Sequence, residues 1–565
     1  MDPKAFYLSR PWTKFFREGQ PTTADVPNAT VADLFDQAVE EFPGKAAIIF
    51  YGRKVTYRQL GESVDKLATA LADMGIKPGD KVALFLLNSP QFVISYFAVL
   101  KAGATVTAIS PVYTSHEIKH QLTDSDAKAL ICQDMLYEKV EKSGVELQNV
   151  IVTSVAEYLP RFKQIIGRSI LGKLFRKLKI STPIKTLAPN MVWFQDLLKN
   201  TVANPPKVQL DPATAIAALP YTGGTTGNPK GAILTHRNLV SAQQISSNFF
   251  SDLERGNEYI MAFLPFFHIY GQLVVMFTSI TNGWTLLLYT TPDLEDILTS
   301  MEVYNVGAFY GVPTLYERLK DFKNTDRVNW KKVKYIICGA DSLHEATVKD
   351  WDARTGTVIS EGYGLTESSS ISNLNPPERP KKGSFGIPGT NMGAAVVDPD
   401  TLEFVAVGEV GELILSGPHI MGGYWQNQKA SDDVFMDVDG ETWLRTGDLV
   451  RMDEDGYFFF FDRQKDLIKF KGYSVFAKDI EDVLYQHPRV KEAGVIGVPD
   501  PAVGHNIKAI VVLQPEARGQ VNEEEIKAYC AEHLAHYKVP KIVEFRGELP
   551  KTDVGKISRR ELRDD

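Results

Sequence analysis

The chain has 565 residues, of which 44% are hydrophobic and 23% charged, and its formal net charge is −8. At roughly 150 residues per domain this length predicts three to four structural units, and the mildly acidic balance excludes a general nucleic-acid binder. The three cysteines are far apart, no run of about 18 apolar residues occurs, and the N-terminus lacks a signal peptide's apolar core, so we expect a cytoplasmic protein without a membrane span.

Residues 81–109 predict a strand, a helix and a second strand. VALFLL is a short apolar run, PQFVISYFAVLKAG begins at Pro90 and ends at Gly103, and ATVTAIS follows. This order predicts a βαβ unit, and hence a parallel sheet with helices on its faces. Further strands are expected at KALICQ (128–133), NVIVTS (149–154) and AIAALPY (215–221).

Residues 116–120 read HEIKH, the H-E-x-x-H pattern of helical zinc proteases. In a helix that begins near Ser115, Ile118 would pack on the core, so His116 and His120 are expected to point to solvent. A zinc hydrolase is nevertheless kept as an alternative function, because downstream carboxylates such as Glu138 could supply a third ligand.

Residues 161–185 are strongly basic, with eight Lys or Arg and no acidic residue between 158 and 195. An apolar residue recurs every four positions, which predicts an amphipathic helix; these residues are Phe162, Ile166, Ile170, Leu174 and Leu178. Such a helix can bind an anionic membrane surface or pack on its own domain. We therefore expect possible peripheral membrane contact through 161–185.

The stretch 221–231, YTGGTTGNPKG, is rich in glycine and threonine. This stretch does not match the Walker A motif, which has glycine before its lysine and serine or threonine after it. Here Pro229 precedes Lys230, and Gly231 follows Lys230. Its composition nevertheless favours phosphate, since glycines expose backbone N–H groups and Lys230 adds a positive charge. The loop alone leaves a solvated β-turn open as a second interpretation.

The arrangement of predicted strands and helices along the chain changes after about residue 383. Short alternating strands and Gly-rich turns predict a β-barrel-like subdomain at about 383–462, and the last hundred residues alternate helices and strands. We predict an α/β protein with a large N-terminal domain of layered, mostly parallel sheets over 1–464. A small mobile α+β domain would span 465–565.

Six segments of the chain, taken in order, resemble the signature motifs of the adenylate-forming superfamily, which contains acyl-CoA synthetases, adenylation domains and luciferases. They are YTGGTTGNPKG, CGAD (338–341), EGYGLTES (361–368), WLRTGDL (443–449), DRQKDLIKFKGY (462–473) and LPKTDVGKISRREL (549–562). The resemblance is greatest to long-chain fatty acid–CoA ligases. It implies that a carboxylate attacks the α-phosphorus of ATP, and that CoA thiol then displaces AMP.

The resemblance implies a site for ATP or AMP and for Mg²⁺. The implied nucleotide contacts are Thr222, Gly223, Gly224, Thr225, Thr226, Gly227, Lys230, Gly339, Ala340, Glu361, Gly362, Tyr363, Gly364, Leu365, Thr366, Asp448, Arg463 and Lys556. Thr226 and Glu367 are the implied Mg²⁺ ligands, since a carboxylate is a hard oxygen donor.

The implied catalytic residues are His268, Lys469 and Lys556. Lys556 would neutralise charge in adenylation. Lys465 matches the family's hinge residue, about which the C-terminal domain would turn so that Lys471, Gly472 and Tyr473 meet CoA. The chain departs from many relatives at Ala477, where they have proline, and this residue follows the segment expected to contact CoA.

The substrate is expected to be a fatty acid. The segment after Pro265 has no acidic residue to bind an amino group, and Gly364 stands where acetate-specific relatives have a Trp. The implied acyl pocket comprises Phe267, His268, Val312, Gly339 and Gly364. Aryl-acid ligases, acyl-AMP ligases that load a carrier protein and a non-catalytic lipid-binding scaffold stay as alternatives, and the sequence leaves monomer and homodimer open.

Overall fold

A computed structural model describes residues 2–160, 187–222, 229–291, 293–470, 473–500, 503–552 and 556–564. Within these ranges no helix has the length and apolar character needed to cross a membrane. The basic stretch 161–185 lies outside the described residues, so membrane contact through it stays a prediction.

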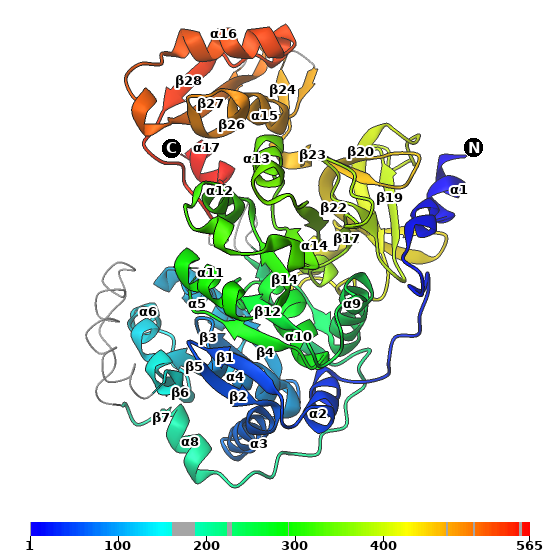
Figure 1. The fold of residues 1–565 in the computed structure, drawn as a ribbon. Helices are drawn as coiled ribbons and strands as arrows, with labels where there is room; N and C mark the ends of the chain where they lie inside the picture. Colours follow the sequence, from blue (N-terminus) through cyan, green and yellow to red (C-terminus); the bar gives the residue numbers. More distant parts are fainter. Residues whose placement is uncertain are drawn as a thin grey trace.

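Two large sheets form the centre of the N-terminal part (Figure 1). The nine-stranded sheet has the order β18 (Ile387–Pro388), β17 (Asn373–Leu374), β16 (Ser360–Tyr363), β15 (Tyr335–Cys338), β14 (Val306–Gly311), β12 (Tyr259–Ala262), β13 (Thr285–Leu288), β1 (Ala46–Phe50) and β2 (Arg53–Thr56). The seven-stranded sheet has the order β11 (Leu234–Thr235), β8 (Ile216–Ala218), β4 (Thr105–Ala108), β3 (Lys81–Phe85), β5 (Ala127–Gln133), β6 (Asn149–Thr153) and β7 (Met191–Trp193). The central strands of both are parallel.

Helices cover these sheets, and the apolar side chains of both layers join one continuous core. The helices of this part of the chain are α1 (Pro3–Leu8), α2 (Val31–Glu41), α3 (Tyr57–Asp73), α4 (Pro90–Lys101), α5 (Ser115–Asp124), α6 (Tyr137–Ser143), α8 (Phe194–Asn200), α9 (His236–Phe249), α10 (Thr278–Thr281), α11 (Leu294–Val303), α12 (Pro313–Asp321), α13 (Glu345–Thr355) and α14 (Gln428–Asp432). Of these, α1 and α14 lie beside strands of the β-rich sheet described below.

The βαβ unit predicted at 81–109 is confirmed as β3, α4 and β4. The Ser89 hydroxyl accepts the Phe92 N–H at the start of α4, and Pro90 fits the first helical turn because that turn needs no N–H from it. The strand expected at 215–221 is instead divided. β8 joins the seven-stranded sheet, whereas β9 (Tyr221–Thr222) pairs with β10 (Lys230–Gly231), and the break falls at Leu219 and Pro220.

The predicted β-rich subdomain is a five-stranded antiparallel sheet. Its strands are β19 (Gly393–Val397), β20 (Val410–Ser416), β21 (Phe435–Val438), β22 (Glu441–Met452) and β23 (Phe458–Arg463). The N-terminal segment packs against it, with α1 beside β19 and the buried Trp12 edge-on to Phe458. The long hairpin β22–β23 carries Asp448 and Arg463.

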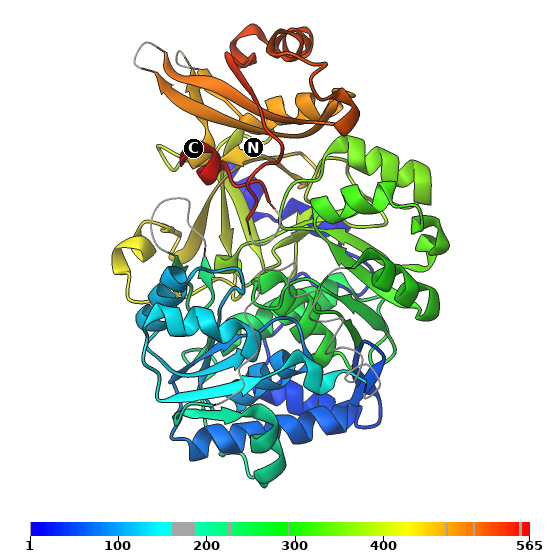
Figure 2. The ribbon, with the colours of Figure 1, turned by 90° about the vertical axis from the view of Figure 1, so that its left-hand side faces the viewer.

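The C-terminal part has its own sheet and core (Figures 1 and 2). It contains β24 (Ile468–Phe470), β25 (Tyr473–Val475), β26 (Val490–Asp500), β27 (Gly504–Leu513), β28 (Ile542–Phe545), α15 (Ala477–Gln486), α16 (Glu523–His533) and α17 (Arg559–Asp564). The α/β fold class with a separate C-terminal domain is thereby confirmed, whereas the boundary between residues 464 and 465 stays a prediction.

Arg559 in α17 ties this domain to the segment that precedes it. Its guanidinium contacts the carboxylates of Asp462, at 2.7 Å, and of Glu481 in α15, at 2.6 Å. Asp462 is fully buried and also accepts the Ala477 N–H at 2.7 Å. The two ends of the C-terminal domain therefore meet at one buried carboxylate.

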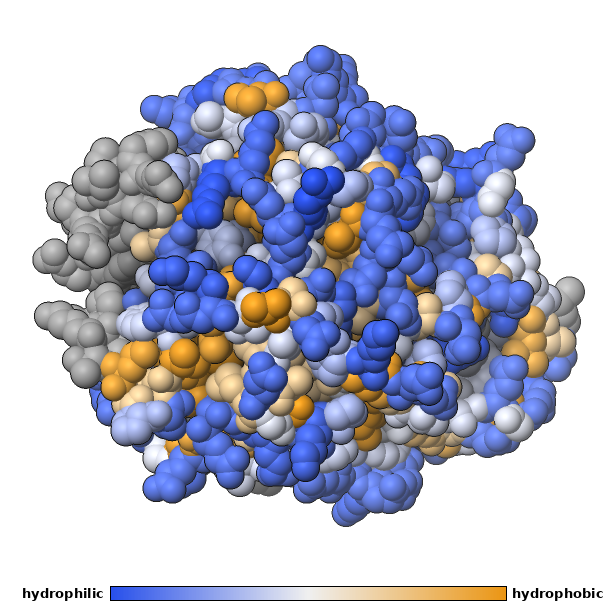
Figure 3. Space-filling view, turned by 90° about the horizontal axis from the view of Figure 1, so that it is seen from below, coloured by the Kyte–Doolittle hydropathy of each residue, from blue (hydrophilic) through white to orange (hydrophobic). Residues whose placement is uncertain are grey.

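The face opposite the C-terminal domain is shown in Figure 3. Hydrophilic side chains dominate it, and hydrophobic ones lie between them. This is the usual composition of a protein surface, because polar atoms alone do not suffice to cover one.

Candidate functional site

Residues that follow or end three neighbouring strands meet at one edge of the nine-stranded sheet. Strands β14, β15 and β16 are parallel, with Gly311 beside Cys338 and Cys338 beside Glu361. Because parallel strands end at the same edge, Val312, Gly339 with Ala340, and Glu361 to Tyr363 are neighbours there. The edge of a sheet at its carboxyl ends is where α/β proteins bind ligands.

Ala340 has a backbone conformation that L residues rarely adopt, with φ at 74°. Such a conformation costs on the order of 1 kcal/mol and is found where a site needs a particular backbone direction. Gly339 precedes it, and its α-carbon faces the ring of Tyr270, which a Cβ would approach to 3.2 Å. This short turn therefore forms a close-packed wall of the site.

Asp448 connects the β-rich sheet with the nine-stranded sheet. It is 3% exposed, and the Tyr363 hydroxyl donates to its Oδ2 at 2.7 Å. Arg463, its partner across the β22–β23 hairpin, places Nε 3.4 Å from Oδ1. Burial and this carboxylate both raise the pKa of Tyr363. Three residues predicted to contact the nucleotide thus form one hydrogen-bonded group.

Glu367 and Lys230 are joined through Tyr424, a residue that the sequence analysis missed. The Tyr424 hydroxyl donates to Glu367 Oε1 at 2.7 Å, and Lys230 Nζ lies 5.0 Å from the Tyr424 ring. Burial and Glu367 raise the pKa of Tyr424. A lone tyrosine in a Gly-rich turn carries no pattern that could have identified it.

The remaining nucleotide candidates fall partly outside the described residues. Thr222 pairs with Lys230 across the β9–β10 bridge, and Leu365 and Thr366 follow β16. Lys465 lies on the surface beside Arg463. Desolvation and the Arg463 guanidinium lower the pKa of Lys465, whereas the carboxylates of Asp448 and Glu367 raise it. The predicted residues that the structure does not describe are Gly223, Gly224, Thr225, Thr226, Gly227, Lys471 and Gly472.

His268, in the N-terminal part, is influenced by the charge of Lys556 in the C-terminal domain. Burial, together with the Lys556 ammonium, lowers the pKa of His268 to about 4. The ring is therefore neutral near pH 7, and its Nδ1 accepts the Tyr270 N–H at 3.2 Å. The proton of the neutral ring is thus assigned to Nε2, which is a hydrogen-bond donor.

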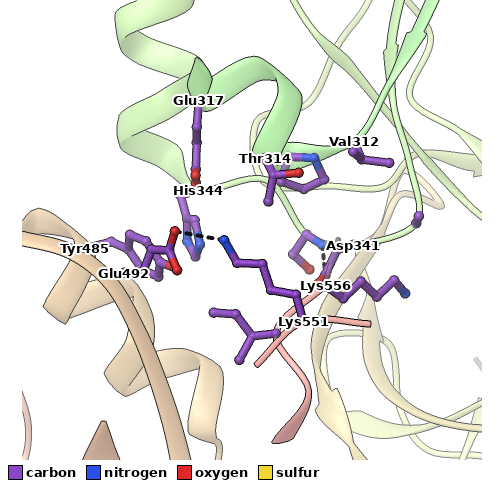
Figure 4. A pocket seen from close by; sticks show the side chains of 13 residues that line it. Val312, Thr314, Glu317, Asp341, His344, Tyr485, Glu492, Lys551 and Lys556 are labelled. Atoms are coloured by element: carbon purple, nitrogen blue, oxygen red, sulfur yellow. Dashed lines mark hydrogen bonds and ion pairs between the residues drawn. The ribbon is translucent and has the colours of Figure 1, made fainter. Parts of the chain in front are cut away.

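A cavity of about 50 Å³ lies between the two domains beside Lys556 (Figure 4). Val312, Ala340 and Asp341 line it from the nine-stranded sheet side, while Tyr485 and Lys551 line it from the C-terminal domain. In Figure 2 the segment that leads to α17 runs from the C-terminal domain down toward the larger part. The predicted lysine therefore reaches the sheet edge where the nucleotide candidates gather.

Gly364 needs a correction. A Cβ at this position would lie 1.2 Å from the backbone carbonyl oxygen of Ser370, so the glycine is explained by close packing of two backbone segments. Ser369 and Ser370 already have positive φ values of 50° and 88°. The interpretation that Gly364 leaves room for an acyl chain is wrong for this backbone.

The HEIKH segment lies on α5, but its residues have other partners. Glu117 closes a capping box with Thr114 at the start of the helix. His116 is exposed as expected, whereas His120 places Nε2 2.9 Å from the carbonyl oxygen of Pro229, so the expectation that it faces solvent is wrong. Among the described residues no group of three His, Cys, Asp or Glu side chains could hold a metal ion. The zinc alternative has no structural support.

The stability of the fold is predicted to depend on Glu361. Burial raises the pKa of this carboxyl from 4.5 to about 7, although the Leu343 N–H donates to it at 3.2 Å. The folded state therefore binds the proton more tightly than the unfolded state, and stability is lost as the pH rises from 4.5 through about 7. Glu361→Gln, which stays neutral, is expected to be about 3 kcal/mol more stable than the wild type at pH 8.

The measurement is chemical unfolding of both proteins at pH 5 and pH 8. The two should have nearly equal stability at pH 5, where both side chains are neutral. An equal difference at both pH values would contradict the assignment, because it would show that the charge of Glu361 is not involved. Glu345→Gln, at an exposed position at the start of α13, is the matched control.

Comparison with known proteins identifies the family. The model of the AMP-binding enzyme family matches residues 35–425, and that of the AMP-binding enzyme C-terminal domain matches residues 479–556. A long-chain-fatty-acid–CoA ligase of Bacillus subtilis (strain 168) is 36% identical over 559 residues, which cover 98% of this chain and 97% of the relative. One of Escherichia coli O6:H1 is 35% identical over 559 residues, covering 96% and 97%.

Solved structures agree with these relatives. The anthranilate CoA ligase AuaEII in complex with anthranoyl-AMP superposes with a TM-score of 0.82 at 26% identity, over 97% of this chain and 98% of that one. Because the family model matches most of the chain and the relatives align over nearly all of it, the chain belongs to the AMP-binding enzyme family and is an AMP-forming acid–thiol ligase.

Proposed function

We propose that the protein is a long-chain fatty acid–CoA ligase. The observation that carries the proposal is the cavity that Lys556 lines together with Val312 and Ala340, at the sheet edge that also holds Tyr363 and Asp448. The full-length relatives that are long-chain-fatty-acid–CoA ligases support the substrate class. The acid and ATP give acyl-AMP and pyrophosphate, and CoA then gives acyl-CoA and AMP.

The nucleotide would lie along the ends of β15 and β16. Asp448 has two carboxylate oxygens that suit the two ribose hydroxyls, and Arg463 and Tyr363 hold that carboxylate in place. The Tyr363 ring, tilted against Phe385 at 4.6 Å, supplies an apolar face for adenine. Lys230 and the loop before it would meet the departing phosphates.

Adenylation joins two anions, so charge neutralisation is the main task of the site. An oxygen of the substrate carboxylate forms a bond to the α-phosphorus, and the bond from that phosphorus to the bridging oxygen of pyrophosphate breaks. Lys556 would balance the negative charge that shifts between these groups. His268 would orient the carboxylate through its Nε2–H, since its ring is neutral.

Glu367 is suited to hold Mg²⁺ with Thr226. Its Oε1 is occupied by the Tyr424 hydroxyl, which fixes the carboxylate and leaves Oε2 for a hard cation. Magnesium prefers one or two carboxylates together with substrate phosphates, and this donor set fits that preference. When bound, the ion supplies charge neutralisation of the phosphate oxygens.

Thioester formation would use a second arrangement of the domains. Rotation about Lys465 withdraws Lys556 and presents Lys469 with Lys471, Gly472 and Tyr473 to CoA. The CoA sulfur then forms a bond to the acyl carbonyl carbon, and the bond to AMP breaks. Lys469 is exposed on β24, as a residue that acts only after rotation should be.

The acyl chain would enter beside Phe267, His268, Val312 and Gly339. A buried π-helical segment, Tyr270–Phe277, continues from His268, and such helices are frequent at functional sites. Aryl-acid CoA ligation is the second candidate, because the anthranilate ligase is a close structural match. A ligase that loads a carrier protein remains a third.

The test is a thioester assay with purified protein, ATP, Mg²⁺ and CoA, across saturated acids from C2 to C20 and cinnamic acids. We expect the highest kcat/KM for long saturated acids. A highest kcat/KM with cinnamate or anthranilate would replace the fatty acid by an aryl acid. Acyl-AMP that accumulates without thioester would favour a carrier protein as the acceptor.

A further inference from the structure

One face of α15 contacts the larger part of the molecule through His344, in addition to the hydrogen bond from the Ala477 N–H to Asp462 at the start of the helix. Lys478, Asp482 and Tyr485 are spaced by four and three residues, so they share a helical face. His344 stacks on the Tyr485 ring at 3.6 Å with an angle of 27° between the rings. Its Nδ1 is 3.3 Å from Asp482 Oδ1, and Asp482 Oδ2 is 2.6 Å from Lys478 Nζ. His344 thus contacts the C-terminal domain by stacking and by hydrogen bonding.

The His344 side chain does not cap the helix that follows it. It stands at the N-cap position of α13, yet its side chain makes no capping hydrogen bond there. The preceding residue, Leu343, donates its N–H to Glu361 on β16. Residues 339–344 therefore run from the sheet edge of the nucleotide site directly to the contact with α15.

The contact is linked to Lys556 by a short path. Glu481, the neighbour of Asp482 on α15, pairs with Arg559 at 2.6 Å, and Arg559 begins α17 just after Lys556. His344, Tyr485 and Lys556 also line the same cavity, in which Figure 4 shows the two rings on one side and Lys556 on the other. The orientation of α15 therefore determines where Lys556 lies.

We propose that His344 is a positioning residue for adenylation, which holds α15 in the orientation that brings Lys556 to His268. The proposal rests on the proposed function. Any rotation of the C-terminal domain for the thioester step has to break the His344–Tyr485 stack, so the contact favours the first half-reaction only. Loss of the stack and hydrogen bond shifts the population of domain orientations away from the adenylating one.

The test measures the two half-reactions separately. ATP–pyrophosphate exchange with a long-chain acid reports adenylation, and thioester formation from chemically prepared acyl-AMP and CoA reports the second step. His344→Ala is expected to slow exchange about tenfold and to leave the second step within about twofold. His344→Phe keeps an aromatic ring against Tyr485 and should recover most of the exchange rate. His116→Ala, at an exposed histidine of α5, is the matched control.

A double-mutant cycle tests whether His344 acts through Tyr485. If it does, His344→Ala in a Tyr485→Ala background causes little further loss of exchange. The proposal would be overturned if the double variant lost exchange activity by the product of the two single losses. It would also be overturned if His344→Ala slowed both half-reactions equally. A wild-type protein that forms no acyl-AMP with any acid would instead remove the proposed function, so the two failures are distinguishable.

Discussion

Replacing Lys556 by alanine is expected to slow acyl-AMP formation by about 10²–10³, the loss seen when a preorganised charge donor is removed from an active site. Lys556 lines the cavity at the sheet edge, and its charge contributes to the lowered pKa of His268, the group proposed to orient the substrate carboxylate. Thioester formation from supplied acyl-AMP should change little. ATP–pyrophosphate exchange and the thioester assay, each with saturating substrates, measure the two rates.

Lys551→Ala is the matched control for this experiment. Lys551 lines the same cavity but pairs with Glu492 at 2.8 Å. Its removal should change exchange by less than a few fold, since a partly exposed ion pair contributes little. Equal losses in both variants would show that the cavity's total charge matters and that Lys556 has no special role. Removal of Lys556 should also raise the pKa of His268, because a neighbouring positive charge is lost.

Substitution of Gly364 is the second large effect that we expect. Any side chain here places a Cβ 1.2 Å from the Ser370 carbonyl oxygen, so the backbone has to move, at a cost of about 3 kcal/mol or more. Gly364→Trp should therefore lose activity with acids of every length and unfold at a lower temperature. A variant that keeps its thermal stability and prefers acetate would restore the interpretation that this glycine sets the length of the acyl pocket.

Gly339→Leu tests the acyl pocket without requiring a backbone segment to move. At Gly339 the atoms nearest to a Cβ belong to the Tyr270 side chain, at 3.2 Å, and a side chain can move where a backbone segment cannot. We expect this variant to remain folded and to lose kcat/KM for long acids more than for short ones. The acid series used for the wild type measures the shift, and an equal loss at all lengths would place Gly339 outside the acyl pocket.

The sequence predicted the fold class and most of the candidate site because both depend on local patterns. The apolar runs of β3, α4 and β4 specify a βαβ unit by themselves, and the residues of TGD, within β22, and of GYG, at the end of β16, are adjacent in the chain. The sequence did not reveal Tyr424 between Glu367 and Lys230, since that contact joins segments far apart in the chain. The error at Gly364 came from close packing against the nearby Ser370 backbone, and the error at His120 came from a contact with Pro229, far away in the chain.

The division of residues 215–221 between two sheets had the same cause. The apolar run AIAALPY has the composition of one strand, and only the pairing partners of β8 and β9 show that it turns at Pro220. His344 likewise has no motif, and its role depends on a helix more than a hundred residues later in the chain.

The pairing of Arg559 with Asp462 and Glu481 has a practical consequence for handling the protein. The last helix is not a dispensable tail, because it fastens the C-terminal domain to β23, the strand that precedes that domain. A purification tag or reporter fused directly after residue 565 would lie next to this junction. A reporter of domain rotation is better placed on α16, where the outer surface of the domain leaves the junction undisturbed.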